Sequence, residues 1–375
     1  MSSFTSKVPS GKTISVRIID STSSINKLPV KALMGPPVPG FDLLPETGTW
    51  SFLVEHDSGR KLLFDLGIPT DWRDMAPQVA DRLKNNGWGI SVEKPTVEIL
   101  KEQSIDATAI EAIVWSHWHW DHIGNPSTFP SSTKLIVGPG FKEEKLPAYP
   151  KNPKADVREI DFEGRDLQEI TFTEQNALQI EPFRAYDYFG DGSFYLLDTP
   201  GHTVGHLAGL ARTTTNPDTF IFMGGDLTHH SGELRPSPLM PLPSSIPSSY
   251  IPALCQHLSM TTACPGSIFE NINSTRDRSP PTTTPFFDPT MGKDIPLAIE
   301  TIKKTQQADA DENVWYVFAH DRTLRGGNVE LFPASANEWK QKGWREKLLW
   351  EFLADFETAA KQMKEKAESE GTKLQ

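Results

Sequence analysis

Three histidines and an aspartate fall within six positions in the segment SHWHWDHIG, which begins at Ser116. Imidazole nitrogens and carboxylate oxygens are ligands that zinc, iron and manganese accept. In an extended loop, residues two apart point to the same side, so His117 and His119 can face one metal ion together. Asp121 and His122 are adjacent and point apart, so they can reach a second ion beside the first. The spacing predicts a metal site with room for two ions.

Three more ligand-type residues stand where apolar runs end. His202 lies in TPGHTVGH, Asp226 in MGGD and His320 in FAHD, each after a run that is expected to form a strand. Functional side chains gather in loops at strand ends. We therefore expect these residues to meet the histidine cluster at one rim of a sheet sandwich. A carboxylate between two ions can bridge them, which makes Asp226 the natural bridging ligand.

Short apolar runs predict the strands that must position these residues, and two amphipathic runs predict helices. The expected strands are residues 13–19, 50–56, 61–67, 111–116, 134–139, 194–202, 206–212, 219–226 and 314–321, and the expected helices are residues 75–85 and 97–103. Residues 344–368 predict a C-terminal amphipathic helix.

The length of 375 residues favours one elaborated domain, residues 1–375. Residues 227–311 are rich in proline, serine and threonine and exceed the length of an ordinary connection. We interpret this segment as a partly ordered insertion within the domain, placed to cover a site. A flexible surface excursion is the alternative interpretation.

The motifs HWHWDH, TPGHTVGH, GGD and FAHD, in that order, resemble those of the metallo-β-lactamase-fold hydrolases over residues 14–321. The resemblance implies an α/β (α+β) protein, an αββα sandwich with a binuclear metal site at one edge. It implies that one ion is held by His117, His119 and His202 and the other by Asp121, His122 and His320, with Asp226 and a hydroxide as bridges. Zinc is the expected metal, and iron, cobalt or manganese also suit these ligands.

Within this family the chain looks most like the branch that opens N-acyl homoserine lactones, because His320 is followed by Asp321. That branch carries a tyrosine three residues after the bridging aspartate, and here the position is His229. A histidine can donate the same hydrogen bond to the lactone carbonyl, or the substrate differs. The resemblance implies that a metal-bound hydroxide attacks the carbonyl and that Asp121 passes a proton to the leaving group. A thioester hydrolase of the same fold, glyoxalase-II-like or polyketide-releasing, is the alternative.

Other residues near the motifs are expected to support the site. His206 follows His202 in one turn and is interpreted as structural, because one ligand per turn suffices. Asp65, which follows KLLF, matches a residue typical of this family near the cluster, and the resemblance implies that it orients a ligand histidine. Trp118 and Trp120 occupy the spacer positions, where they pack or line an apolar entrance.

The resemblance implies a small-molecule ester or lactone as the partner, and the composition disfavours other classes of partner. A net charge of −12 and a pI of about 5.4 disfavour nucleic acid and anionic membrane surfaces. The N-terminus lacks the apolar run of a signal peptide, and no run approaches the roughly 20 residues of a spanning helix, so a cytoplasmic protein is expected. A redox di-iron protein of this fold typically has a glutamate in place of His119 and an attached flavin domain, and neither is present. Nothing in the pattern indicates an oligomeric state.

Overall fold

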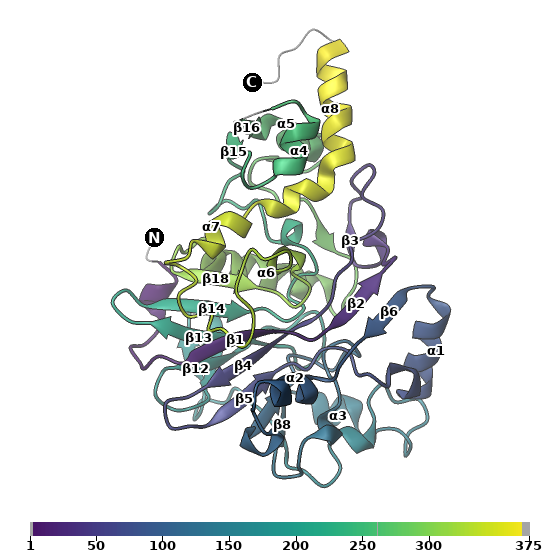
Figure 1. Cartoon of the computed structure of the whole chain (residues 1–375), viewed down its shortest axis with the longest axis vertical. Coiled ribbons are helices and arrows are strands. Elements are labelled where there is room, and N and C mark those ends of the chain that lie inside the picture. Colours follow the sequence, from purple (N-terminus) through teal and green to yellow (C-terminus); the bar gives the residue numbers. More distant parts are fainter. Residues whose placement is uncertain (1–2, 261, 370–375) are drawn as a thin grey trace.

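Two six-stranded β-sheets lie face to face in the computed structural model, which describes residues 3–260 and 262–369 (Figure 1). The first sheet contains, in spatial order, β1 (Ser15–Asp20), β4 (Trp50–Glu55), β5 (Lys61–Phe64), β7 (Ala112–Val114), β8 (Lys134–Val137) and β9 (Leu167–Glu169). The second contains β10 (Leu178–Ile180), β11 (Phe183–Asp187), β12 (Phe194–Asp198), β13 (Leu207–Thr214), β14 (Thr219–Met223) and β18 (Val314–Val317).

Alternating side chains give each sheet two apolar faces. In β4, Phe52 and Val54 belong to the core between the sheets, whereas Leu53 belongs to the core outside the first sheet. In β14, Ile221 packs between the sheets and Phe222 packs outside the second sheet. Successive residues of a strand point to opposite faces, so both sheets require a covering layer.

Helices provide these covering layers. The helices α1 (Pro77–Asn85), α2 (Thr96–Glu102) and α3 (Phe141–Lys145) share the outer core of the first sheet, and α6 (Ile295–Asp309) packs on the second sheet beside β18. The order helix, sheet, sheet, helix confirms the αββα sandwich expected from the sequence. No helix in the described residues is both long and apolar enough to cross a membrane.

Every expected strand is present, but several end earlier than their apolar runs. β12 ends at Asp198, β14 at Met223 and β18 at Val317. The residues that follow, up to and including those with ligand-type side chains, therefore lie in loops rather than in strands.

Residues 227–311 are folded over much of their length. β15 (Ser245–Pro247) pairs with β16 (Ala263–Pro265), and α4 (Pro252–His257) and α5 (Gly266–Ser274) lie beside them at the top of Figure 1. Further along the segment, β17 (Asp288–Pro289) pairs with β3 (Met34–Gly35). A separate small ladder joins β2 (Ser23–Asn26) and β6 (Gly89–Val92).

The C-terminal helix is present in three parts rather than as one helix over residues 344–368. It consists of α7 (Trp344–Leu348), a 3-10 helix (Glu351–Phe356) and α8 (Glu357–Ser369). The carbonyl of Leu349 accepts a hydrogen bond from Arg235 Nη1 at 2.8 Å, and the backbone of the buried Trp350 leaves the helical region at φ −118° and ψ 9°. A competing side-chain donor and a buried tryptophan therefore break the helix.

Candidate metal centre

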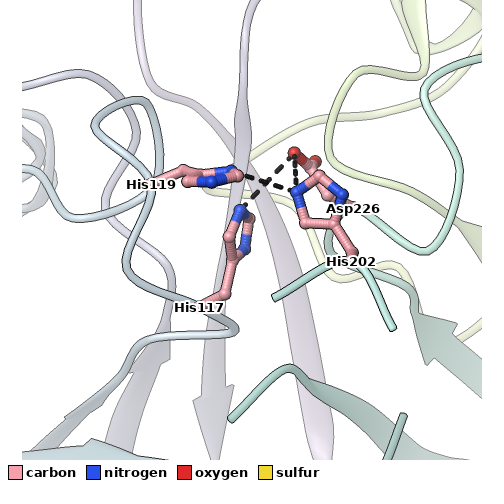
Figure 2. A group of neighbouring side chains, drawn as sticks. All are labelled: His117, His119, His202 and Asp226. Atoms are coloured by element: carbon pink, nitrogen blue, oxygen red, sulfur yellow. Dashed lines mark hydrogen bonds and ion pairs between the residues drawn. The ribbon is translucent and has the colours of Figure 1, made fainter. Parts of the chain in front are cut away.

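Loops that follow four different strands converge at one edge of the sandwich. His117 and His119 come from the loop after β7, His202 from the loop after β12 and Asp226 from the loop after β14. Figure 2 shows these four side chains pointing toward one another. His320, in the loop after β18, reaches the same place.

The first group of ligand-type atoms comprises His117, His119, His202 and Asp226, and these atoms all lie within 4.8 Å of one another. His202 Nε2 is 3.0 Å from His119 Nδ1 and 3.4 Å from Asp226 Oδ2. His117 Nε2 is 3.6 Å from the same carboxylate oxygen. Three imidazoles and one carboxylate at these separations can surround one divalent cation.

The second group comprises Asp121, His122 and His320, again with ligand-type atoms within 4.8 Å of one another. His320 Nε2 is 3.4 Å from Asp121 Oδ2. Asp226 Oδ1 is 3.1 Å from His122 Nε2 and 3.2 Å from His320 Nε2. One oxygen of Asp226 therefore faces each group, which is the placement a bridging carboxylate needs.

Several ligand atoms at this edge are buried without hydrogen-bond partners, as expected for atoms that bind metal ions. His117 Nε2, His122 Nε2 and Asp226 Oδ1 are buried and have no hydrogen-bond partner among the residues that the structure describes. A buried polar atom without a partner costs about 1–3 kcal/mol. Several such atoms facing one another are expected where cations bind, and this donor set suits zinc.

Burial and neighbouring charges shift the pKa values of the ligand residues toward the forms that bind cations. In the metal-free protein, burial and then neighbouring imidazoles lower the pKa of His117 and His202 well below the usual range, and burial lowers the pKa of His119 to about 3. These imidazoles are neutral at pH 7, which is the form that binds metal. Burial raises the pKa of Asp226, but the imidazoles of His122 and His320 outweigh it and hold that pKa well below the usual range.

Asp65 contacts His122 of the second group, as expected from the family resemblance. Its Oδ2 is 2.9 Å from His122 Nδ1 and also accepts the Ser116 hydroxyl at 2.7 Å, while its Oδ1 accepts the Ser116 backbone N–H at 2.7 Å. A carboxylate on one ring nitrogen directs the other nitrogen outward, here toward Asp226. The backbone at Asp65 has φ 58°, a conformation that aspartate and asparagine tolerate.

Replacing Asp65 with asparagine is expected to weaken metal retention by about 10- to 100-fold, because His122 loses its charged partner while the backbone conformation is kept. Competition with a chelator, followed by metal analysis, measures this. The exposed Asp74→Asn serves as the matched control. Equal retention by the two variants would show that Asp65 does not support the site.

Two further histidine contacts fix the geometry. His320 Nδ1 lies 2.9 Å from the Gly48 carbonyl, so it donates there and leaves Nε2 for the second group. His206 Nε2 accepts the backbone N–H of Asp226 at 3.1 Å, and its Nδ1 lies 2.9 Å from the Thr199 hydroxyl. Both ring nitrogens of His206 are therefore engaged in holding the bridge candidate, which agrees with the structural role expected for it.

A cavity of about 200 Å³ opens onto both groups and is lined in part by His119, Asp121, Asp226 and His320. Its other walls are mostly apolar, including Leu28, Leu33, Trp88, Trp120 and Met291, with the exposed Arg82 among them. Trp120 thus lines the cavity, whereas Trp118 packs under the Lys145 ammonium. Arg82, Trp88 and Met291 were not identified from the sequence, because they lie in distant segments without a ligand-type pattern.

The adjacent residues His229 and His230 point to different places. His229 is buried, lines the cavity and has its Nε2 3.5 Å from Asp226 Oδ2. Burial lowers its pKa, but Asp226 and Glu233 outweigh burial and raise it to about 10 in the metal-free protein. His230 instead accepts the Gly232 N–H at 3.0 Å and packs its ring on aromatic side chains away from the site.

Comparison with known proteins agrees with the fold. Residues 44–213 match the sequence profile of the metallo-beta-lactamase superfamily. The chain is 44% identical to the gamma-lactamase FDB1 of Fusarium pseudograminearum, over 92% of this chain and 83% of that protein. It is 39% identical to the cytochrome P450 monooxygenase mpaDE of Penicillium roqueforti over 94% of this chain, but it spans only 38% of that protein's length.

Among solved structures, the AiiA mutant from B. thuringiensis with N-decanoyl-L-homoserine bound aligns with a TM-score of 0.56 at 17% identity, over 86% of this chain and 100% of that one. At this identity the likeness concerns the fold. The profile match and the 44% identical relative show the family: the protein belongs to the metallo-beta-lactamase superfamily. It is a metallo-hydrolase of that superfamily.

Proposed function

We propose that the protein is a binuclear metal-dependent hydrolase that opens small lactones. The observation that carries the proposal is the placement of Asp226, with one carboxylate oxygen toward each ligand group, at the floor of a small cavity. Two divalent ions, for which zinc is the best candidate, would be held by His117, His119 and His202 on one side and by Asp121, His122 and His320 on the other, with Asp226 shared.

When bound, two such cations supply Lewis-acid polarisation of the scissile carbonyl and a water nucleophile of lowered pKa. Two residues of the chain would supply the proton transfer and the hydrogen bond to the carbonyl oxygen. Asp121 lies at the cavity with Oδ2 3.4 Å from His320 Nε2, where it can pass a proton to the leaving oxygen as the ring opens. His229 Nε2 faces the same space and can donate a hydrogen bond to the carbonyl oxygen.

The cavity favours a compact substrate. Ligand pockets for drug-sized molecules occupy about 300–1,000 Å³, and this cavity is smaller, at about 200 Å³. Trp88 and Trp120 offer apolar faces to a ring. Arg82, at the exposed part of the lining, is placed to attract the carboxylate that ring opening releases.

A cyclic amide is the second candidate substrate, because the relative FDB1 with 44% identity is named a gamma-lactamase. A γ-lactam and a γ-lactone share ring size and carbonyl position, and they differ in the leaving atom. Nitrogen leaves less readily than oxygen and needs a proton as the bond breaks. Proton transfer by Asp121 would therefore matter more for a lactam than for a lactone.

Substrate panels test the proposal. The metal-replete protein is incubated with γ- and δ-lactones, N-acyl homoserine lactones, γ-lactams and acyl thioesters. Mass spectrometry detects ring-opened products that have gained one water, or the free acid and thiol released from a thioester. Turnover of lactones that disappears on chelation is expected. Turnover of γ-lactams alone would move the protein to the second candidate, and turnover of thioesters alone would contradict both and favour a thioesterase.

Replacing His229 with alanine is expected to lower kcat by about 10²- to 10³-fold while two metal ions are retained, because a donor to the developing oxyanion is lost. Steady-state kinetics and metal analysis on the same preparation measure this. His230→Ala is the neighbouring control: it loses the cap on the turn and its ring contacts, so it should lower thermal stability but keep kcat per folded molecule. An unchanged kcat in His229→Ala would remove the proposed role.

A further inference from the structure

One wall of the cavity at the metal centre comes from two segments that are far apart in the sequence. Leu28, Ala32 and Leu33 lie before β3, whereas Met291 lies just after β17, within the long segment of residues 227–311. All four line the same cavity as the ligand-type residues. Met291 is only partly buried, so its side chain keeps surface that a ligand in the cavity can touch. The long segment therefore contributes a side chain to the site.

Backbone hydrogen bonds join these two segments. The strand β3 pairs antiparallel with β17. Directly beyond β17, Thr290 donates its backbone N–H to the Leu33 carbonyl at 2.8 Å, which brings the chain at Met291 beside the chain at Leu33. Each of the two strands is only two residues long, and an isolated pair of strands is marginally stable. A wall built on this ladder needs further support.

Arg276, which follows α5, provides such support. Its Nε donates to the Pro37 carbonyl at 2.9 Å and its Nη2 donates to the Pro36 carbonyl at 2.7 Å, both directly after β3. Its Nη2 also donates to the carbonyl of Phe286, just before β17. One guanidinium thus connects the chain on the two sides of the ladder through three backbone carbonyls. Hydrogen bonds from a charged donor are about twice as strong as neutral ones.

We propose that Met291 limits the size of the substrate at the metal centre and that Arg276 is a positioning residue, which holds the wall formed by Met291 and Leu33. The inference rests on the proposed function for its substrate, a small ring whose carbonyl lies at the ligand-type residues. A substituent on that ring has to lie along the apolar walls, and the cavity is only about 200 Å³. A wall held in place excludes a bulky substituent instead of moving aside for it.

Two carboxylic acids of different bulk test Met291 without requiring turnover. Butyrate and cyclohexanecarboxylate are titrated by isothermal calorimetry into the metal-replete protein, since carboxylates are ligands for such ions. In Met291→Ala, the affinity for cyclohexanecarboxylate relative to butyrate is expected to rise by about tenfold. Met240→Ala is the matched control, because it shortens another partly buried methionine of the same segment that does not line the cavity. An unchanged ratio in Met291→Ala, or no binding of either acid, would overturn the assignment.

Two lactones separate this inference from the proposed function. The ratio of kcat/KM for γ-octanolactone to kcat/KM for γ-butyrolactone is measured on one preparation, so that any loss of folded protein cancels. Met291→Ala is expected to raise this ratio by about tenfold. If neither lactone is opened while the ratio of the two acids still shifts, the proposed lactone opening is wrong and the role of Met291 is supported. Lactone opening with an unchanged ratio would contradict the role of Met291 alone.

Amide hydrogen exchange tests Arg276. In Arg276→Ala, the Thr290 amide is expected to exchange about tenfold faster or more, because three charge-assisted hydrogen bonds beside the ladder are lost. The ratio of the two acids should rise as well, since a loosened wall discriminates less. Arg276→Lys keeps a charged donor and should restore part of both effects, and Arg184→Ala, at an exposed position on β11, should match the wild type. Unchanged exchange and an unchanged ratio in Arg276→Ala would contradict its positioning role.

Discussion

Asp226→Ala is expected to lose both metal ions and to lower hydrolysis by at least about 1,000-fold. The carboxylate is the group common to the two ligand sets, with Oδ1 near His122 and His320 and Oδ2 near His117 and His202. Its removal takes one anionic ligand from each ion and leaves several imidazoles facing one another without a counter-charge. A loss of several kcal/mol of metal-assisted stabilisation corresponds to this factor.

Metal analysis and turnover on one preparation check this prediction. Asp226→Asn is the closer substitution, since it keeps the shape of the side chain and removes its charge; both variants keep the backbone N–H that donates to His206. Asp166→Ala, which replaces an exposed aspartate, is the control for metal lost during mutation and purification alone. Two ions retained with full turnover in Asp226→Ala would show that this residue does not bridge the ions.

Metal removal is expected to lower the melting temperature by about 10 °C or more. Ions that bind only the folded chain stabilise it by about 4 kcal/mol for each site at a thousandfold excess over Kd, and a chain of this size loses a few degrees for each kcal/mol. Three of the ligand atoms, His117 Nε2, His122 Nε2 and Asp226 Oδ1, are buried and have no hydrogen-bond partner among the described residues, so removal of the ions leaves them uncompensated.

Differential scanning calorimetry with and without a chelator measures the shift. Asp226→Ala serves as the control, because a variant without metal should melt at the same temperature in both conditions. A wild-type melting temperature unchanged by a chelator that strips the ions would mean that the ions contribute nothing to the fold.

The sequence predicted the sandwich and the convergence of ligand-type residues because both depend on local patterns. The runs before His117, His202 and Asp226 are apolar and short, and they form β7, β12 and β14. Ligand-type residues stand directly beyond them, so a shared sheet edge suffices to bring them together. Asp65, which follows β5, was expected from the family resemblance rather than from a local pattern.

What the sequence could not predict depends on contacts between distant segments. Arg82 and Trp88 reach the cavity only because the chain around α1 folds over the first sheet. The break near Trp350 depends on Arg235, which is more than a hundred residues away. Glu233 had no pattern of its own, and its role follows from the backbone N–H groups of His229 and His230, which donate to its carboxylate.

The central claim is that hydrolysis depends on two ions held by the shared Asp226. The most direct test adds zinc in measured equivalents to the metal-stripped protein while bound metal and turnover of a γ-lactone are followed together. The account predicts that two equivalents bind and that turnover reaches its plateau only with the second. A plateau at one equivalent, or hydrolysis by the stripped protein, would contradict it.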